Sequence, residues 1–163
     1  MSKTTKKGDY SGKKRTGRQS NPSNEKKPVI VADTSNGYYD KYPCWVFRRF
    51  DFRHPKWGIS NNLSDIEQIL TYLSNLESQR WSEILTDKSG RRSNTRNHHI
   101  DISELSKDAQ SRATEIRVDE FGELCSIAIS GQKRVWGYIV DGTFFVVWLD
   151  VNHEIYPYEK RNT

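Results

Sequence analysis

The most regular hydrophobic pattern lies near the C-terminal end of the chain, where β-branched and aromatic residues fill three short runs between glycine-containing turns. Asp141-Gly142 is a strong hairpin signal, because a type I′ turn needs positive φ at both central positions. Gly131-Gln132 suits a type II′ turn. Residues 124–151, LCSIAISGQKRVWGYIVDGTFFVVWLDV, are therefore predicted to form three antiparallel strands joined by two tight hairpins.

Alternation of side chains along these strands predicts which of them share a face of the sheet. The turns place Arg134 opposite Leu149 and Lys133 opposite Asp150. One face is predicted to be the core face, on which the helices lie. Its residues are Cys125, Ile127, Ile129, Trp136, Tyr138, Phe145, Val147 and Leu149. The other face is also apolar, so either the first strand and a loop shield it or something binds there.

Apolar residues that recur every three or four positions indicate helices in the middle of the chain. The segment 64–85 carries one apolar stripe and begins with a capping box of Ser64 and Glu67. The segment 102–116 predicts a second helix. Residues 86–99 lack periodicity and are predicted to be a loop.

An aromatic-rich segment at 41–52 predicts a first strand. The elements then follow the order β-α-α-β-β-β, and the expected fold class is α+β, with an antiparallel sheet packed against two to three helices. A chain of 163 residues has room for one domain of ordinary size. Residues 41–163 are predicted to form this domain, preceded by a disordered basic arm over residues 1–40.

The excess positive charge of the chain lies in this arm. The whole chain has a formal charge of +5, and residues 1–40 carry nine Lys and Arg against four Asp and Glu. The arm has too little apolar surface to offset the entropy of ordering it. A basic arm can hold nucleic acid through phosphate contacts, with Lys13, Lys14 and Arg15 as candidates. A solubilising tail without a specific partner is the alternative.

Hydropathy and cysteine content indicate the cellular compartment in which the protein is expected to act. No apolar run approaches the roughly 18 residues that span a bilayer, so no membrane contact is expected. No apolar stretch follows the first lysines, so no secretory signal is predicted. Cys44 and Cys125 are the only cysteines and lack CxxC spacing, which favours a reducing, cytoplasmic setting. The four histidines show no ligand spacing, so neither a metal site nor a cofactor is expected.

Two stretches resemble the RelE/ParE superfamily of small bacterial toxins, and its RelE- and HigB-like members especially. GQKRVWGYIV (131–140) is similar to the glycine turn of this family, followed by an arginine and the next strand. VVWLDVNHEIYPY (146–158) is similar to its last strand, with a basic or histidine residue and a terminal tyrosine. The resemblance implies a RelE/ParE-like domain of a toxin–antitoxin system, with an antitoxin protein as partner.

The resemblance also implies a metal-independent endoribonuclease that cuts mRNA, with the ribosome as a further partner. Such cleavage needs a base for the ribose 2′-hydroxyl, cations for the charged transition state and an acid for the leaving 5′-oxygen. Arg134 matches the strand arginine of the family and is expected to hold the scissile phosphate, aided by Lys133. His153 is expected to be the general acid or base. Tyr156 is expected to stack on a base or donate a proton.

Each of these residues also has a purely structural interpretation. Arg134 can be a rim residue whose stem covers apolar surface. Lys133 can pair with Asp150 across the strands. His153 can be an inert surface histidine, and Tyr156 can serve packing alone.

A second basic cluster lies in the predicted loop between the helices. Its members are Arg91, Arg92, Arg96, His98 and His99. Such a loop can bind RNA phosphate or supply the base, although a charged loop needs no function.

Two further functions of the protein remain possible besides the nuclease. One is a non-catalytic binding module or ParE-like inhibitor of a protein target such as gyrase, and the other is a nucleic-acid-binding protein that uses its basic arm.

Overall fold

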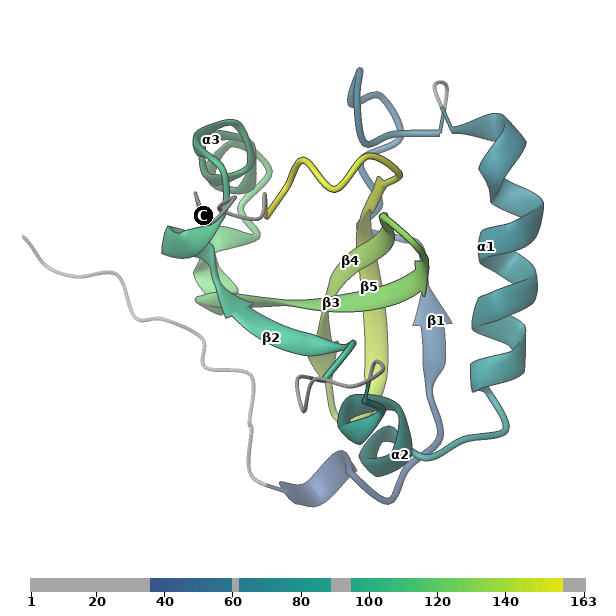
Figure 1. The fold of residues 1–163 in the computed structure, drawn as a ribbon. Helices are drawn as coiled ribbons and strands as arrows, with labels where there is room; N and C mark the ends of the chain where they lie inside the picture. The colour runs from purple at the N-terminus through teal and green to yellow at the C-terminus, as the bar shows by residue number, and fades with distance from the viewer. Residues whose placement is uncertain (1–35, 60–61, 89–94, 157–163) are drawn as a thin grey trace, which may run out of the picture.

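The computed structural model describes residues 36–59, 62–88 and 95–156 (Figure 1). Within these residues the protein has an α+β fold with five strands, three α-helices and three short 3-10 turns. The strands and α-helices are β1 (Cys44–Val46), α1 (Leu63–Leu76), α2 (Trp81–Thr86), β2 (His98–Asp101), α3 (Lys107–Glu115), β3 (Glu123–Ser130), β4 (Lys133–Val140) and β5 (Thr143–Asp150). The 3-10 turns are Asn36–Tyr38, Ile102–Glu104 and Asp119–Phe121.

The five strands form one mixed sheet in the order β1-β5-β4-β3-β2. The two hairpins of β3, β4 and β5 are present as predicted, and the turn between β4 and β5 has φ of 50° at Asp141 and 85° at Gly142. β1, however, runs parallel to β5, with Trp45 beside Phe144. The prediction of a purely antiparallel sheet is therefore wrong. A long connection through helices joins β1 to its partner, and such a connection permits parallel pairing.

β2 is an edge strand, and its first two residues were predicted to belong to a loop. His98 lies opposite Ser126, and Ile100 lies opposite Leu124 in an antiparallel ladder. The strand has four residues, of which only Ile100 is apolar, so the sequence offers no alternation to detect. The predicted element order therefore lacked one strand, which lies between the helices.

The helices are shorter than the segments that the hydrophobic periodicity predicted to be helical. The segment 64–85 divides into α1 and α2, and the predicted capping box is wrong, because α1 begins after Asn62. α2 begins after Arg80, whose backbone N–H donates to a Glu83 carboxylate oxygen at 2.7 Å. The segment 102–116 contains a 3-10 turn followed by α3. None of the helices in the described residues is long and apolar enough to cross a membrane.

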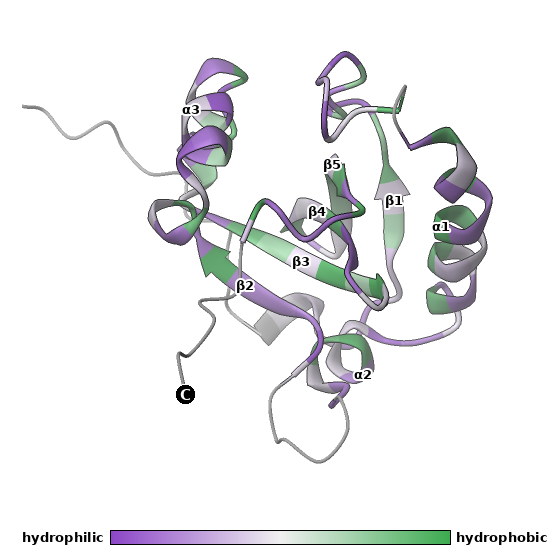
Figure 2. Ribbon diagram, turned by 45° about the horizontal axis from the view of Figure 1, so that its top comes forward, coloured by the Kyte–Doolittle hydropathy of each residue, from purple (hydrophilic) through white to green (hydrophobic). Residues whose placement is uncertain are grey.

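Both faces of the sheet are covered (Figure 1). α1 and α2 bury Leu73 and Trp81 against one face, here called the α1 side. α3 and the segment after β5 cover the other face, here called the α3 side, with Ala109, Ala113 and Ile155 in its core. Figure 2 shows that β1 and β3 are largely hydrophobic. It also shows that α3 is mostly hydrophilic, and the buried residues of this helix are its two alanines. The second apolar face is thus covered by the chain itself.

Two register shifts alter the predicted faces. The β3–β4 ladder shifts near its turn, so that Ile127 lies opposite Val135 rather than Trp136. The β4–β5 ladder shifts beside Gly137. Trp136 consequently lies with Trp148 on the α3 side, whereas Ile127 lies on the α1 side. The predictions that these residues share one face, and that all helices cover that face, are wrong, because a bulge reverses the alternation beyond it.

A buried ion pair fastens α3 to the segment that follows β1. Arg112 donates from Nε and Nη2 to the two carboxylate oxygens of Asp51 at 2.7 and 2.8 Å. The Trp148 indole N–H donates to the same carboxylate at 3.2 Å. Burial alone would raise the pKa of Asp51, but the hydrogen bonds from Arg112 and Trp148 lower it below its ordinary value. The pair is therefore ionised at neutral pH.

Replacing Asp51 by Asn should lower the free energy of unfolding by about 3 kcal/mol, because Arg112 would lose its buried counter-charge. Asp108→Asn is the matched control, since the Lys56–Asp108 pair is solvent-exposed, and its effect should stay below about 0.5 kcal/mol. Urea unfolding followed by tryptophan fluorescence measures both. Equal effects of the two substitutions would contradict a structural role for the buried pair.

Candidate functional site

Three of the predicted site residues come from three separate segments and lie within electrostatic reach of one of them, His98. They are His98 at the start of β2, Arg134 in β4 and His153 in the segment after β5. Arg134 and His153 both lie close enough to His98 to act electrostatically on its ring. We call these three residues the His98–Arg134–His153 cluster.

Strand pairing explains how His98 and Arg134 reach the same face. His98 lies opposite Ser126, which in turn lies opposite Trp136 in β4. Arg134 is two residues before Trp136 and therefore points to the same side of the sheet. The predicted register paired Arg134 with Leu149, on the core face of the sheet. In the observed register Arg134 pairs with Asp150, and Arg134 lies on the same face as His98.

Arg134 lies at the end of its strand, half-buried beside the hairpin turn. Its Nη1 donates to the backbone carbonyls of Gly131 at 2.8 Å and Lys133 at 2.9 Å. These bonds fix the position of the guanidinium group at the rim of the sheet. The remaining N–H groups of the fork keep the capacity to bind an anion.

Asp150 holds the segment that carries His153. The side chain of Asp150 is buried, and its two carboxylate oxygens accept the backbone N–H groups of Glu154 and Ile155, each at 2.9 Å. His153 itself has a φ of 61°, in the left-handed region that residues other than glycine rarely adopt. The carboxylate therefore stabilises the backbone conformation that brings the half-buried imidazole toward the cluster.

The environment of His98 favours its neutral form. Burial lowers the pKa of His98, and repulsion from Arg134, His153 and His99 lowers it further, against a hydrogen bond to the backbone of Thr95. A histidine with a lowered pKa is unprotonated at neutral pH and can accept a proton. His98 therefore has the properties of a general base.

Lys133 does not join the cluster. Its ammonium group lies on the α1 side, 2.7 Å from a carboxylate oxygen of Asp65 and 2.5 Å from the side-chain oxygen of Gln68. The predicted Lys133–Asp150 pair is wrong, because the register places Arg134 opposite Asp150. Neighbouring residues of one strand point to opposite faces, and this separates Lys133 from Arg134.

His99 is separated from His98 in the same way. Its Nδ1 lies 3.0 Å from a carboxylate oxygen of Glu123, and its Nε2 lies 3.4 Å from the Tyr38 hydroxyl. Arg96 lies 3.6 Å from a carboxylate oxygen of Asp87. These contacts give His99 and Arg96 structural partners away from the cluster.

The remaining predicted residues divide into one with a packing role and several outside the described part of the chain. Tyr156 is half-buried and packs against the hydrophobic cluster of the α3 side. Residues that lie outside the described ranges are Arg91, Arg92, Lys13, Lys14 and Arg15.

Sequence reasoning missed the role of Asp150 and proposed His98 only as a member of a basic loop. For Asp150 a signal existed, because an aspartate three residues before His153 is well placed to accept N–H groups from the following turn. For His98 the signal was absent, because β2 itself was not predicted.

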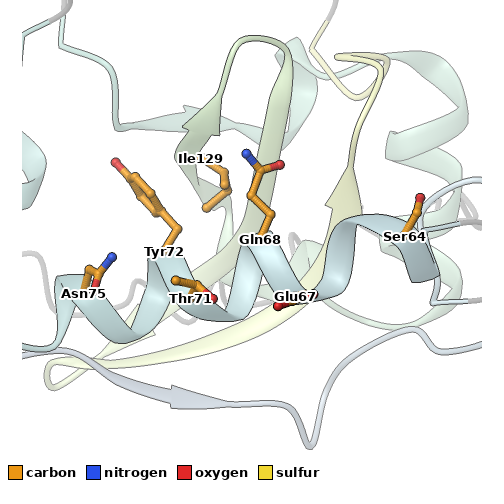
Figure 3. Close-up of a pocket in the computed structure, with 7 residues that line it drawn as sticks. All are labelled: Ser64, Glu67, Gln68, Thr71, Tyr72, Asn75 and Ile129. Atoms are coloured by element: carbon orange, nitrogen blue, oxygen red, sulfur yellow. The ribbon is translucent and has the colours of Figure 1, made fainter.

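The pocket drawn in Figure 3 is a different kind of site. It has a volume of about 400 Å³ and lies along α1, with Ile129 of β3 on the other side. The residues that line it are Ser64, Glu67, Gln68, Thr71, Tyr72, Asn75 and Ile129. None of these is basic, so this pocket does not suit a phosphate group. In the described ranges, no group of three or more His, Cys, Asp or Glu residues is placed to hold a metal ion.

Comparisons of the chain with models of protein families, with curated proteins and with solved structures found no match. The chemistry of the site is therefore inferred from the side chains themselves.

The pKa of His98 should lie below the ordinary histidine value of about 6.5. In the variant Arg134→Gln it should rise, because one source of repulsion is removed. His54 is the internal control, since burial lowers its pKa as well but Arg134 does not contribute to that shift. NMR titration of the imidazole resonances measures both values in one sample. A His98 pKa that is unchanged by the substitution would show that the two groups are not neighbours.

Asp150→Ala should release the segment after β5, because the backbone N–H groups of Glu154 and Ile155 lose their acceptors. Hydrogen exchange of these two amides should accelerate at least tenfold, since each bond to a buried carboxylate stabilises by about 1.5–3 kcal/mol. Glu154→Gln is the control, because that side chain is exposed. Unchanged exchange in Asp150→Ala would contradict the proposed role of the carboxylate.

Proposed function

We propose that this chain is a toxin-like, metal-independent endoribonuclease that acts on mRNA and belongs to a bacterial toxin–antitoxin system. The observation that carries the proposal is that Arg134 and His153 lie within electrostatic reach of His98, with His98 and Arg134 on the same face of the sheet. Two imidazoles and a guanidinium supply the base, the acid and the cation that phosphodiester cleavage requires. The resemblance of residues 131–140 and 146–158 to RelE- and HigB-like toxins supports the same function.

Each residue of the cluster has one role in the proposed reaction. Neutral His98 takes the proton of the ribose 2′-hydroxyl, and the resulting oxygen attacks the adjacent phosphorus. Arg134 donates hydrogen bonds to the non-bridging oxygens as negative charge develops on them. The bond from phosphorus to the 5′-oxygen breaks, and His153, as the general acid, donates a proton to that oxygen. The products are a 2′,3′-cyclic phosphate and a 5′-hydroxyl end.

The lowered pKa of His98 supports its assignment as the base rather than the acid. Lys133 and Tyr156 have no direct role in this scheme, because the first pairs with Asp65 and the second packs against the core. The proposal includes the cytoplasm as its setting, the translating ribosome as the place of action and a protein antitoxin as the partner that restrains it. The basic residues outside the described ranges would add affinity for RNA.

Expression of the chain in a bacterial host should arrest growth and produce mRNA fragments with 5′-hydroxyl ends. The substitutions His98→Ala, Arg134→Ala and His153→Ala should each reduce cleavage by about 100-fold or more, as expected for loss of a general acid, base or phosphate-binding group. His99→Ala is the matched control, because the adjacent imidazole faces Glu123 on the other side of the sheet, and it should cleave like the unmodified chain. Sequencing of 5′-hydroxyl RNA ends shortly after induction measures these effects.

Growth arrest with intact RNA would reject the nuclease and favour a ParE-like inhibitor of a protein target. Cleavage that persists in both Arg134→Ala and His153→Ala would place the chemistry elsewhere. Binding of nucleic acid that disappears when residues 1–27 are deleted, without any cleavage, would favour a binding protein that uses its basic arm.

A further inference from the structure

The segment 47–56, which follows β1, presents basic and aromatic side chains to solvent. Phe47 is 36% exposed and Phe52 is 53% exposed. Arg48, Arg49 and Arg53 alternate with these rings along the chain and are exposed as well. Exposed phenyl rings between arginines are a combination that a purely structural loop does not require.

The two exposed rings are held in place by a buried one. Phe50 is 6% exposed and lies in the core of the α1 side. The ring of Phe47 packs edge-to-face with it at 6.3 Å between centroids, and the ring of Phe52 does so at 4.9 Å. Both rings therefore have a fixed orientation while part of their surface stays accessible.

The backbone of the segment is fastened to the end of β5. Asp51 N–H donates to the Val147 carbonyl, and Leu149 N–H donates to the Trp57 carbonyl, each at 3.0 Å. Gly58 closes the segment tightly, because a side chain there would approach the carbonyl oxygens of Phe52 and His54 to 2.6 Å. A rigid frame therefore presents the arginines and the two phenyl rings.

The charge that this surface shows to solvent is positive. Asp51 is the only acid of the segment, and it is turned inward to Arg112. In the described part of the chain, no carboxylate forms an ion pair with Arg48, Arg49 or Arg53. Lys56 differs from these arginines, because it pairs with Asp108 at 3.2 Å. Arg49 and Arg53 therefore have their charge available for a partner, whereas the Arg48 guanidinium lies 6.0 Å from the centroid of the Phe145 ring.

The surface lies at the end of β5 from which the His153 segment starts. The Val147 carbonyl accepts the Asp51 N–H of the basic segment, Leu149 bonds to Trp57 just after this segment, and Asp150 organises the residues that follow β5. Figure 1 shows the connection from β1 to α1 and the segment after β5 at the same end of the sheet. The segment 47–56 therefore lies at the end of the sheet from which the residues that include His153 continue.

We propose that the segment 47–56 is a binding surface for single-stranded RNA. Arg48, Arg49 and Arg53 contact phosphates, and Phe47 and Phe52 stack on bases. Single-stranded nucleic acids bind grooves and surfaces in which basic residues alternate with aromatic platforms, because every base has a face that can stack. The choice of RNA rests on the proposed function, whereas the binding itself does not require cleavage.

The cavity next to this segment is not included in the surface. It has a volume of about 410 Å³, and its charged side chains other than Arg53 are Lys56, Asp108, Arg112 and Glu115. These four side chains neutralise one another, since Lys56 pairs with Asp108, and Arg112 contacts Glu115 at 2.6 Å. An anion gains little from a site whose charges are already paired.

Fluorescence anisotropy with a labelled 2′-O-methyl RNA oligonucleotide tests the proposal, because this probe cannot be cleaved by attack of a 2′-hydroxyl. For the full chain, the double variant Arg49→Gln/Arg53→Gln should bind at least tenfold more weakly in 50 mM salt. Its plot of log affinity against log salt should be shallower by about 1.4, since each phosphate contact to a single strand contributes about 0.7. Phe52→Leu should weaken binding about tenfold through lost stacking, without a change of slope.

The matched control is Lys41→Gln/Arg80→Gln, which also removes two positive charges but lies outside the segment 47–56. Both side chains are engaged in ion pairs, with Asp141 and Asp40, so this variant should retain more than half of the affinity of the unmodified chain. All the substituted side chains are exposed, and unchanged urea unfolding midpoints would confirm that the variants fold.

Equal affinity and equal salt slope for Arg49→Gln/Arg53→Gln and for the control would overturn the proposal. It would also be overturned if duplex RNA, or vesicles with acidic lipid, bound as tightly as the single strand and responded to Phe52→Leu in the same way. If the segment variants lose binding but the unmodified chain never cleaves RNA, the surface stands and the nuclease is rejected. If cleavage occurs and the variants bind normally, the nuclease stands and this surface is rejected.

Discussion

The carboxylate of Asp150 is the group on which the geometry of the candidate site depends. It is buried at the end of β5, where an unpaired charge would be strongly unfavourable, and two backbone N–H groups stabilise it. The same residue lies opposite Arg134 in the sheet. Asp150 therefore pairs in the sheet with the strand that carries Arg134, and its side chain holds the segment that carries His153.

β5 connects all the parts of the molecule to which we assign a function. It pairs with β1 on one side and with β4 on the other. Its C-terminal half also bonds to the segment 47–56 through the Val147 carbonyl, and to Trp57 just after this segment through the Leu149 N–H. The Trp148 indole between these positions donates to the Asp51 carboxylate. Residues near the end of β5 thus hold the segment 47–56, through Val147, and the segment that carries His153, through Asp150.

The sequence predicted those parts of the fold that depend on local signals. The hairpin at Asp141-Gly142 was predicted correctly, because a two-residue turn of this composition determines its own conformation. The parallel pairing of β1 was not predicted, because its partner lies about a hundred residues further along the chain. The two register shifts were also missed, since a bulge depends on the packing of both faces and leaves no simple alternation in the sequence. These shifts reversed the assigned faces of Trp136 and its neighbours.

The site was predicted in part for the same reasons. Arg134 and His153 came from a resemblance in their immediate surroundings, and both lie within electrostatic reach of His98. The sequence did not predict that His98 and His99 have different roles. Strand alternation places His98 on the α3 side of the sheet and His99 against Glu123 on the other side, and the strand itself was not predicted. Lys133 and Arg134 were proposed as joint phosphate contacts, yet adjacent strand residues point to opposite faces.

The central claim is that His98, Arg134 and His153 bind one phosphodiester together. NMR titration with an uncleavable RNA dinucleotide that contains a single phosphate tests this claim most directly. We expect the imidazole resonances of His98 and His153 to shift together with one dissociation constant, and both shifts to disappear in Arg134→Gln, while the resonances of His54 and His99 stay in place. A shift of only one of the two cluster imidazoles, or shifts that persist without Arg134, would contradict a shared site.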